Sequence, residues 1–201
     1  MQSDTRQVNP LAYDLALRLK GQGFALTIRN RGVTLSDERL DWTFDGRADA
    51  ARLDSIAQVH LQTGGAWMEE GLIAMCRITF RDGRTLSVSD VDQAGLKDDA
   101  RAGTYCAFVR DLHGRLARLD STARFTAGYG EVQFRVIAIC AALLGAIGIG
   151  IPLVALLFRP NLEILLMLGG GIALTVPLFT MLMKNAPRSY DLRHFPIELL
   201  P

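Results

Sequence analysis

The sequence predicts an α+β protein, in which a small antiparallel β-barrel capped by one helix precedes a hairpin of two transmembrane helices. Three observations support this prediction. Apolar residues recur at every second position through most of residues 12–90, which is the period of half-buried strands. The period then lengthens to three or four residues, as in an amphipathic helix. Two long, almost uncharged apolar stretches follow residue 135.

The composition argues against two classes of function. The chain has 201 residues and a formal net charge of +1, without the excess of one sign that a nucleic-acid-binding protein or an enzyme for acidic substrates shows. Its three cysteines, Cys76, Cys106 and Cys140, lie far apart with no CxxC spacing, which indicates neither a zinc site nor a disulfide framework. We therefore expect no nucleic-acid partner, no metal and no cofactor.

Strands are expected from residue 12 to residue 90. Residues 13–20 alternate strictly, and we favour a strand there over a short helix from Leu11 to Leu19, capped by Asn9 with Pro10 at its first position. Asp82-Gly83 is a strong hairpin signal. The apolar positions of the later strands are Phe24, Leu26 and Ile28; Val33 and Leu35; Leu40, Trp42 and Phe44; Ile56, Val59 and Leu61; Leu72, Ala74, Cys76, Ile78 and Phe80; and Leu86 and Val88.

One amphipathic helix of about five turns is expected to close the barrel. Asp98 and Asp99 precede it, where negative charge offsets the helix dipole. We expect His113 to face solvent near Asp111. The apolar stripe of the helix consists of Tyr105, Phe108, Val109, Leu112, Leu116 and Leu119.

This order of elements resembles the pleckstrin-homology-like (PH-like) domains of bacterial membrane proteins. The resemblance lies in "LDSIAQVHLQTGG", "AMCRITFRDGRTLSVSD" and "YCAFVRDLHGRL", and the ending "YDLRHFPIELLP" is similar to that of uncharacterised bacterial membrane proteins with this domain. It implies a binding or scaffolding module. Relatives that bind phosphoinositides use basic residues around the first hairpin. Arg29 and Arg31 offer such a phosphate contact here, and a solvated turn is the alternative.

A second candidate contact is the loop that contains Trp67 and Met68. Large apolar residues at a loop tip can enter a membrane or a partner protein. Packing beneath the barrel is the alternative.

Two membrane spans are expected, over residues 136–158 and 162–183, because about 20 apolar residues cross the hydrocarbon core. Small residues, among them Gly145, Gly150 and Gly169, mark faces on which the two helices pack together, or on which another protein packs. Basic residues flank the outer ends of the spans and are scarce between them, which predicts that both termini are cytoplasmic. These residues are Arg118, Arg124 and Arg135, then Arg159 in the connection, then Lys184, Arg188 and Arg193.

The tail after the second span carries two prolines, Pro187 and Pro196, which favour extended backbone. An extended peptide with spaced apolar anchors fits a groove or a sheet edge. We expect it to dock on the chain's own domain, and docking on another protein or burial among headgroups are the alternatives. The anchors are Tyr190, Phe195, Leu199 and Leu200.

The sequence carries no nucleophile, metalloprotease or phosphate-loop motif, and its three histidines are isolated from one another. The N-terminus "MQSDTRQVNP" lacks the features of a signal peptide. We therefore expect a non-enzymatic protein of the cell inner membrane that presents a binding or scaffolding domain, with membrane lipid and another protein as partners. An accessory or assembly subunit of a larger membrane complex is the alternative. The expected divisions are an N-terminal segment 1–11, a domain 12–120, a linker 121–135, the spans within 136–183, and a docking tail 184–201.

Overall fold

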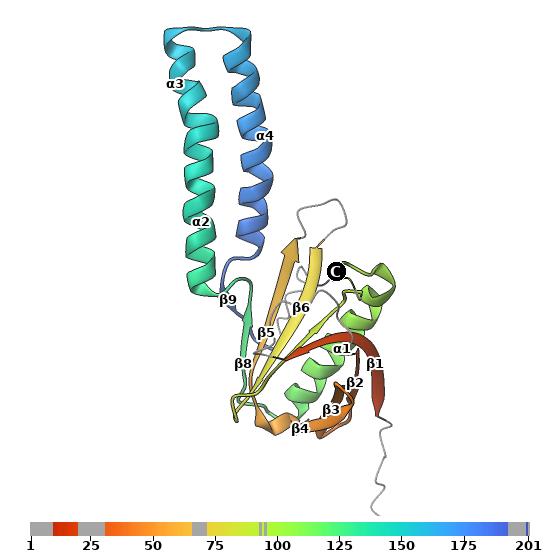
Figure 1. Ribbon diagram of the computed structural model, residues 1–201. Coiled ribbons are helices and arrows are strands. Elements are labelled where there is room, and N and C mark those ends of the chain that lie inside the picture. The colour runs from red at the N-terminus through yellow and green to blue at the C-terminus, as the bar shows by residue number, and fades with distance from the viewer. Residues whose placement is uncertain are drawn as a thin grey trace, which may run out of the picture. The chain divides into compact units, whose positions relative to one another are not determined.

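A computed structural model of the chain describes residues 10–19, 31–65, 72–92, 94, 96–192 and 200 (Figure 1). The chain forms two compact units. The first, the sheet domain, consists of Met1–Ala127 together with Ser189–Pro201, so the tail belongs to it. The second, the helical hairpin, is Gly128–Arg188. The protein is therefore α+β, and a single sheet domain is interrupted by the hairpin.

Within the described residues, nine strands form one mixed sheet in the order β4-β3-β2-β1-β7-β6-β5-β8-β9. Two antiparallel meanders, β1 to β4 and β5 to β7, join through the pair β1 and β7, whereas β8 runs parallel to β5. The sheet is open, with β4 and β9 at its edges, so a closed, purely antiparallel barrel is not what these strands form. The strands are β1 (Leu11–Leu19), β2 (Arg31–Leu35), β3 (Arg39–Phe44), β4 (Arg47–Arg52), β5 (Ile56–Gly65), β6 (Leu72–Phe80), β7 (Thr85–Ser89), β8 (Arg124–Ala127) and β9 (Arg188–Ser189).

Residues 11–19 form a strand, as the alternation predicts, and not the alternative helix. The register of β1 shifts between Tyr13 and Ala16. Such a bulge bends a strand and increases its twist. It lets the first half of β1 pair with β2, where Leu11 faces Leu35, and the second half pair with β7.

Helix α1 (Asp99–Arg118) packs on the sheet and buries the predicted apolar stripe, except that Leu119 lies beyond the last turn and is exposed. The Asp98 side chain caps the helix by accepting a hydrogen bond of 3.0 Å from the Ala100 N–H. The aspartates therefore mark the helix start, as predicted. A short 3₁₀ turn, η1 (Leu53–Ser55), connects β4 to β5.

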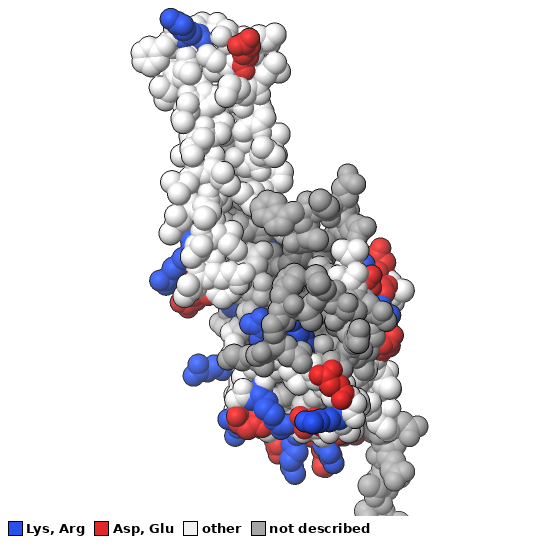
Figure 2. All heavy atoms as spheres, in the orientation of Figure 1, with Lys and Arg blue, Asp and Glu red and all other residues white. Residues whose placement is uncertain are grey.

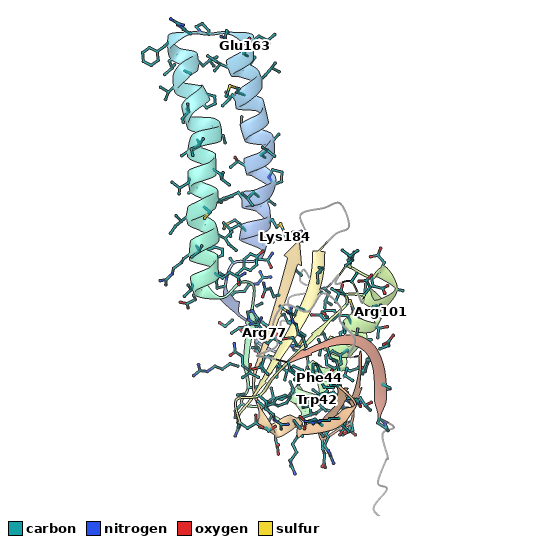
Figure 3. All side chains as sticks on the ribbon, viewed as in Figure 1. Trp42, Phe44, Arg77, Arg101, Glu163 and Lys184 are labelled. Carbon is teal, nitrogen blue, oxygen red and sulfur yellow. The ribbon has the colours of Figure 1, made fainter. Side chains whose placement is uncertain are left out.

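The hairpin has two helices that are long and apolar enough to cross a membrane. The first, Glu131–Phe158, consists of α2 (Glu131–Gly145), a π-helical turn η2 (Ala146–Gly150) and α3 (Ile151–Phe158). The second is α4 (Leu162–Lys184), and Figure 3 shows Glu163 and Lys184 at its opposite ends. The π-helical turn ends two residues before Pro152, whose ring cannot fit inside a regular helical turn.

The two helices approach each other closely at a glycine pair that was not among the predicted packing residues. A Cβ on Gly171 would overlap the Gly148 carbonyl oxygen and lie 2.5 Å from its carbonyl carbon. Of the predicted packing residues, Gly145 lies against Thr175, where a Cβ would be 3.2 Å from the side chain. Neither Gly150 nor Gly169 has an atom within 4 Å of its Cβ position among the described residues.

A candidate docking site for the C-terminal tail

Three segments of the sheet domain meet in an aromatic cluster formed by His113 of α1, Phe125 of β8 and Tyr190 of the tail. The His113 and Tyr190 rings stack with centroids 5.8 Å apart. Phe125 lies 5.6 Å from the His113 ring and 5.8 Å from the Tyr190 ring. The tail therefore contributes one of the three rings of a contact between helix and sheet.

Hydrogen bonds fix the orientation of His113. Its Nδ1 lies 2.7 Å from the Val109 carbonyl oxygen, one turn earlier on α1, and its Nε2 lies 2.7 Å from the Tyr190 hydroxyl. Because a carbonyl only accepts, Nδ1 carries the proton, and the hydroxyl therefore donates to Nε2. The prediction that His113 faces solvent is wrong, because the side chain is only 5% exposed.

Burial determines the ionisation of this pair. Desolvation lowers the pKa of His113 to about 4, against a smaller opposing effect of the bond to Val109. Desolvation also raises the pKa of the Tyr190 hydroxyl above its usual range. Both side chains are therefore neutral at physiological pH, which suits a contact inside a core.

The tail is held by its backbone as well. The Tyr190 N–H donates a hydrogen bond of 3.1 Å to the Phe125 carbonyl oxygen, which continues the edge position of β9 beside β8. Leu192 and Leu200 are partly buried against the core of the sheet domain. Of the four predicted anchors, Tyr190 and Leu200 thus pack on the chain's own domain, whereas Phe195 and Leu199 lie outside the described residues.

The strand that receives the tail falls in the segment expected to be a linker. Phe125 and Ala127 of β8 point into the core, and Arg124 and Thr126 point outward. The short alternation "RFTA" is the local signal for this strand. It was missed because four residues are too few to distinguish a strand from a loop.

The two ends of the hairpin meet at Gly128, within the second unit. Gly128 has a φ of +90°, and a Cβ there would overlap the Ala186 carbonyl oxygen and lie 2.6 Å from that of Asn185. The Tyr129 N–H donates to the same Asn185 oxygen over 2.8 Å. Glycine is needed at this position for its backbone conformation and for the close approach of the returning chain.

Most of the other predicted contact residues lie outside the described residues. Arg29, Trp67 and Met68 are outside the described residues, and Arg31 begins β2 opposite Ala16, with its side chain not described. The structure therefore brings none of them to the aromatic cluster as a described side chain.

A surface cleft of about 510 Å³ lies against β2, β3 and β4. Its lining includes Arg39, Asp41 and Asp49, and these charges have partners. Arg39 pairs with Asp41 over 3.4 Å, and Asp49 pairs with Arg84 over 2.8 Å. Among its described lining residues, the cleft offers no convergent set of unpaired charges for a ligand.

Other buried ionisable groups of the sheet domain lie away from the aromatic cluster. Asp90 is fully buried, and its Oδ1 accepts a hydrogen bond of 3.0 Å from the Ala74 N–H, while desolvation raises its pKa. Burial raises the pKa of the Cys76 thiol to about 12, so it is a poor nucleophile at neutral pH. No group of three or more metal-binding side chains occurs among the residues that the structure describes.

Comparisons with known proteins do not show the function of this chain. No family model matches the chain, and no curated protein matches it. Among solved structures, it is similar to Inner Membrane Complex sub-compartment protein 3 from Toxoplasma gondii, with 17% sequence identity and a TM-score of 0.27 over 50% of this chain and 73% of that chain. A similarity at this level carries no argument about function.

Proposed function

We propose that this chain is a non-enzymatic, membrane-anchored binding or scaffolding protein, whose PH-like domain is held at the cytoplasmic face of the inner membrane by the hairpin and by its own tail. The docked tail is the observation that carries this proposal. The sheet domain continues into the hairpin after Ala127 and resumes at Ser189, and Tyr190 then packs on His113 and Phe125. One folded domain thus includes the chain on both sides of the hairpin.

The strand order supports the PH-like part of the proposal. A meander of four strands, a meander of three strands and a helix follow one another, and bent β1 is shared between the two meanders. This is the order on which the resemblance to bacterial PH-like membrane proteins rests. The assignment to a bacterial inner membrane depends on that resemblance alone.

The docked tail also supports a topology in which both ends of the hairpin lie on the same side of the membrane. A folded domain cannot lie on both sides of a bilayer, so both ends of the hairpin must emerge on the side of the sheet domain if the helices span. The basic residues at those ends favour the cytoplasmic side. On this account, only the short connection containing Arg159 reaches the opposite face.

A pull-down in mild detergent, followed by mass spectrometry, tests the proposal. The full chain is compared with a version truncated after Pro187 and with the Tyr190→Ala variant, which keeps the tail but removes its aromatic anchor. We expect the full chain to bring down a partner through its sheet domain, and both variants to show a loosened domain by limited proteolysis. A sheet domain that resists protease equally in all three proteins would show that the tail does not support it.

An accessory subunit of a larger membrane complex is the second candidate. The observation in its favour is that Gly169 is exposed and Gly150 partly exposed, and that outside their own helix neither has a neighbour within 4 Å of its Cβ position among the described residues, so another helix could approach them closely. The same pull-down distinguishes the candidates. A stoichiometric membrane partner that is retained by the truncated chain, and lost when Gly169 is replaced by Leu, would favour the subunit.

A further inference from the structure

One face of the sheet domain carries arginines that have no acidic partner among the described residues. It is the outward face of β1, β7, β6, β5 and β8, and we call it the arginine face. Its arginines are Arg18, Arg77 and Arg124, all exposed. Arg77 is labelled on β6 in Figure 3.

The strand register places these residues side by side. Arg18 pairs with Ser87, Ser87 pairs with Arg77, Arg77 pairs with His60, and His60 pairs with Thr126. This is one continuous row across five strands, and Arg124 lies two residues from its end on the same face of β8. The next row, Leu17, Val88, Cys76, Leu61 and Ala127, points inward and is buried.

Among the described residues, the part of this face formed by β5 to β8 and the second half of β1 contains no acid, whereas the exposed Asp14 lies in the first half of β1 and pairs with Arg101 over 3.5 Å. The strands β5, β6, β7 and β8 have no Asp or Glu in their sequences, and neither does the part of β1 that pairs with β7. Among the described residues, Arg18, Arg77 and Arg124 take part in none of the ion pairs. The polar neighbours on the face, such as Ser87 and Thr126, are uncharged.

The other half of the sheet differs in this respect. There Arg39 pairs with Asp41, and Asp49 pairs with Arg84, which lies in the turn between β6 and β7 and also pairs with Asp82. Figure 2 shows Lys and Arg beside Asp and Glu over the β3 and β4 end of the sheet domain. The acids of the sheet are thus concentrated where arginines neutralise them, and the arginine face keeps its positive charge.

The spacing fits an extended anionic surface better than one small anion. Neighbouring strands lie about 4.8 Å apart, so the Arg18 and Arg77 positions, two strands apart, are separated by about 10 Å. Arg77 and Arg124 are also two strands apart. Guanidinium groups distributed in this way over a sheet surface can each meet a different phosphate.

Chain connectivity indicates which anionic surface is available. Gly128 to Gly130 are the residues between the end of β8 and the start of α2. A connection of this length reaches at most about 14 Å, even when fully extended. The β8 edge of the arginine face therefore stays close to the point where the first helix begins, and a tethered surface is met at high effective concentration.

We propose that the arginine face binds the anionic phospholipid headgroups of the bilayer in which the hairpin is inserted. This rests on the proposed function, in which the hairpin spans that bilayer. The attraction arises from basic side chains in the negative potential of an anionic leaflet, and it weakens as salt screens that potential. It would hold one face of the sheet domain to the membrane and leave the opposite, charge-paired half available to other molecules.

The test is arginine footprinting of the unaltered full chain in two kinds of nanodisc. One kind contains phosphatidylcholine alone, and the other contains phosphatidylcholine mixed with phosphatidylglycerol. Modification by phenylglyoxal is followed for each arginine by mass spectrometry. Arg47 of β4 is the internal control, because it is exposed, forms no ion pair among the described residues and lies outside the arginine face.

We expect modification of Arg18, Arg77 and Arg124 to slow roughly fivefold in the anionic discs, the factor expected for a basic residue at an anionic surface. High salt should abolish the difference, and Arg47 should react equally in both discs. Equal rates for the three arginines in both discs would overturn the proposal. Protection in native membranes but not in anionic discs would also overturn it and would indicate an acidic protein instead. Incorporation of the chain into the discs tests separately whether the hairpin inserts into a bilayer. A failure of membrane anchoring can therefore be distinguished from a failure of the arginine face to bind lipid.

Discussion

Acidification should weaken the sheet domain through His113. This side chain is 5% exposed and lies between the Val109 carbonyl and the Tyr190 hydroxyl. Its pKa is about 4 in the folded chain, against 6.5 for a solvated histidine. The unfolded chain therefore takes up a proton as the pH falls through 6.5, while the folded chain resists it until about pH 4.

The sign and the size of the effect follow from this difference. Because the unfolded state binds more protons between these two values, stability is fully present above pH 6.5 and falls as the pH decreases. Each pH unit in that interval costs about 1.4 kcal/mol. At pH 5 the free energy of unfolding should be lower by about 2 kcal/mol, and near pH 4 by about 3 kcal/mol.

The assay is urea unfolding of the full chain in detergent micelles at pH 7.5 and at pH 5, followed by tryptophan fluorescence. Both tryptophans, Trp42 and Trp67, belong to the sheet domain, so the signal does not report on the hairpin. The matched control is His113→Gln, which keeps a side-chain oxygen able to accept from Tyr190 and does not titrate. Asp90, whose raised pKa acts with the opposite sign, is present in both proteins and cancels in the comparison.

The reasoning would be refuted if the unaltered chain and His113→Gln lost the same stability between the two pH values. That result would mean that His113 reaches solvent in the folded chain, as its position on the helix first suggested. The contact with Tyr190 would then not be the closed, neutral pair described above.

Three further substitutions test other contacts. Tyr190→Phe removes the hydrogen bond that the hydroxyl donates to His113 Nε2 and should lower the urea-unfolding free energy by about 1 kcal/mol; an unchanged midpoint would contradict the hydrogen bond. Gly171→Ala should loosen the helical hairpin, which would be seen as faster protease cleavage in micelles. Gly170→Ala should not, because there is open space at the Gly170 Cβ position. Equal cleavage of the two variants would count against the close approach of the helices at Gly148 and Gly171. Gly128→Ala should lower the melting temperature through overlap with the returning chain, whereas Gly130→Ala should leave it unchanged; equal melting temperatures would argue against that approach.

The periodicity of apolar residues was sufficient to predict the helices and strands that bury a continuous apolar face. The strand β1, the stripe on α1 and the two long helices all repeat an apolar pattern over many residues, so neighbouring positions support one interpretation. The aspartate at the start of α1, Asp98, could also be predicted from the local sequence, because capping joins residues close together in the chain.

The missed elements lack such a pattern. Strand β4, "RADAAR", buries only Ala51 fully and is held by its pairing with β3 after the tight turn at Asp45 and Gly46, where both residues have positive φ. "DG" is a hairpin signal that could have indicated this turn. A sheet edge needs little apolar surface, so its sequence resembles a loop.

The tail site could be predicted only in outline. Proline spacing and apolar anchors indicated an extended peptide that docks, and Tyr190 is such an anchor. Its partner His113 lies 77 positions away along the chain, and no local pattern relates two residues at that separation. The pair Gly148 and Gly171 was missed for a similar reason, because the relative rotation of two helices decides which of several glycines meet.

The measurement that tests the central claim most directly is hydrogen exchange of the Tyr190 amide in the full chain, reconstituted in nanodiscs. Its N–H donates to the Phe125 carbonyl of β8 when the tail is docked on its own domain. We predict that this amide exchanges orders of magnitude more slowly than a free peptide, and that His113→Ala, which removes the stacked ring, restores faster exchange. Exchange of the Tyr190 amide at the rate of a free peptide in the unaltered chain would contradict the account.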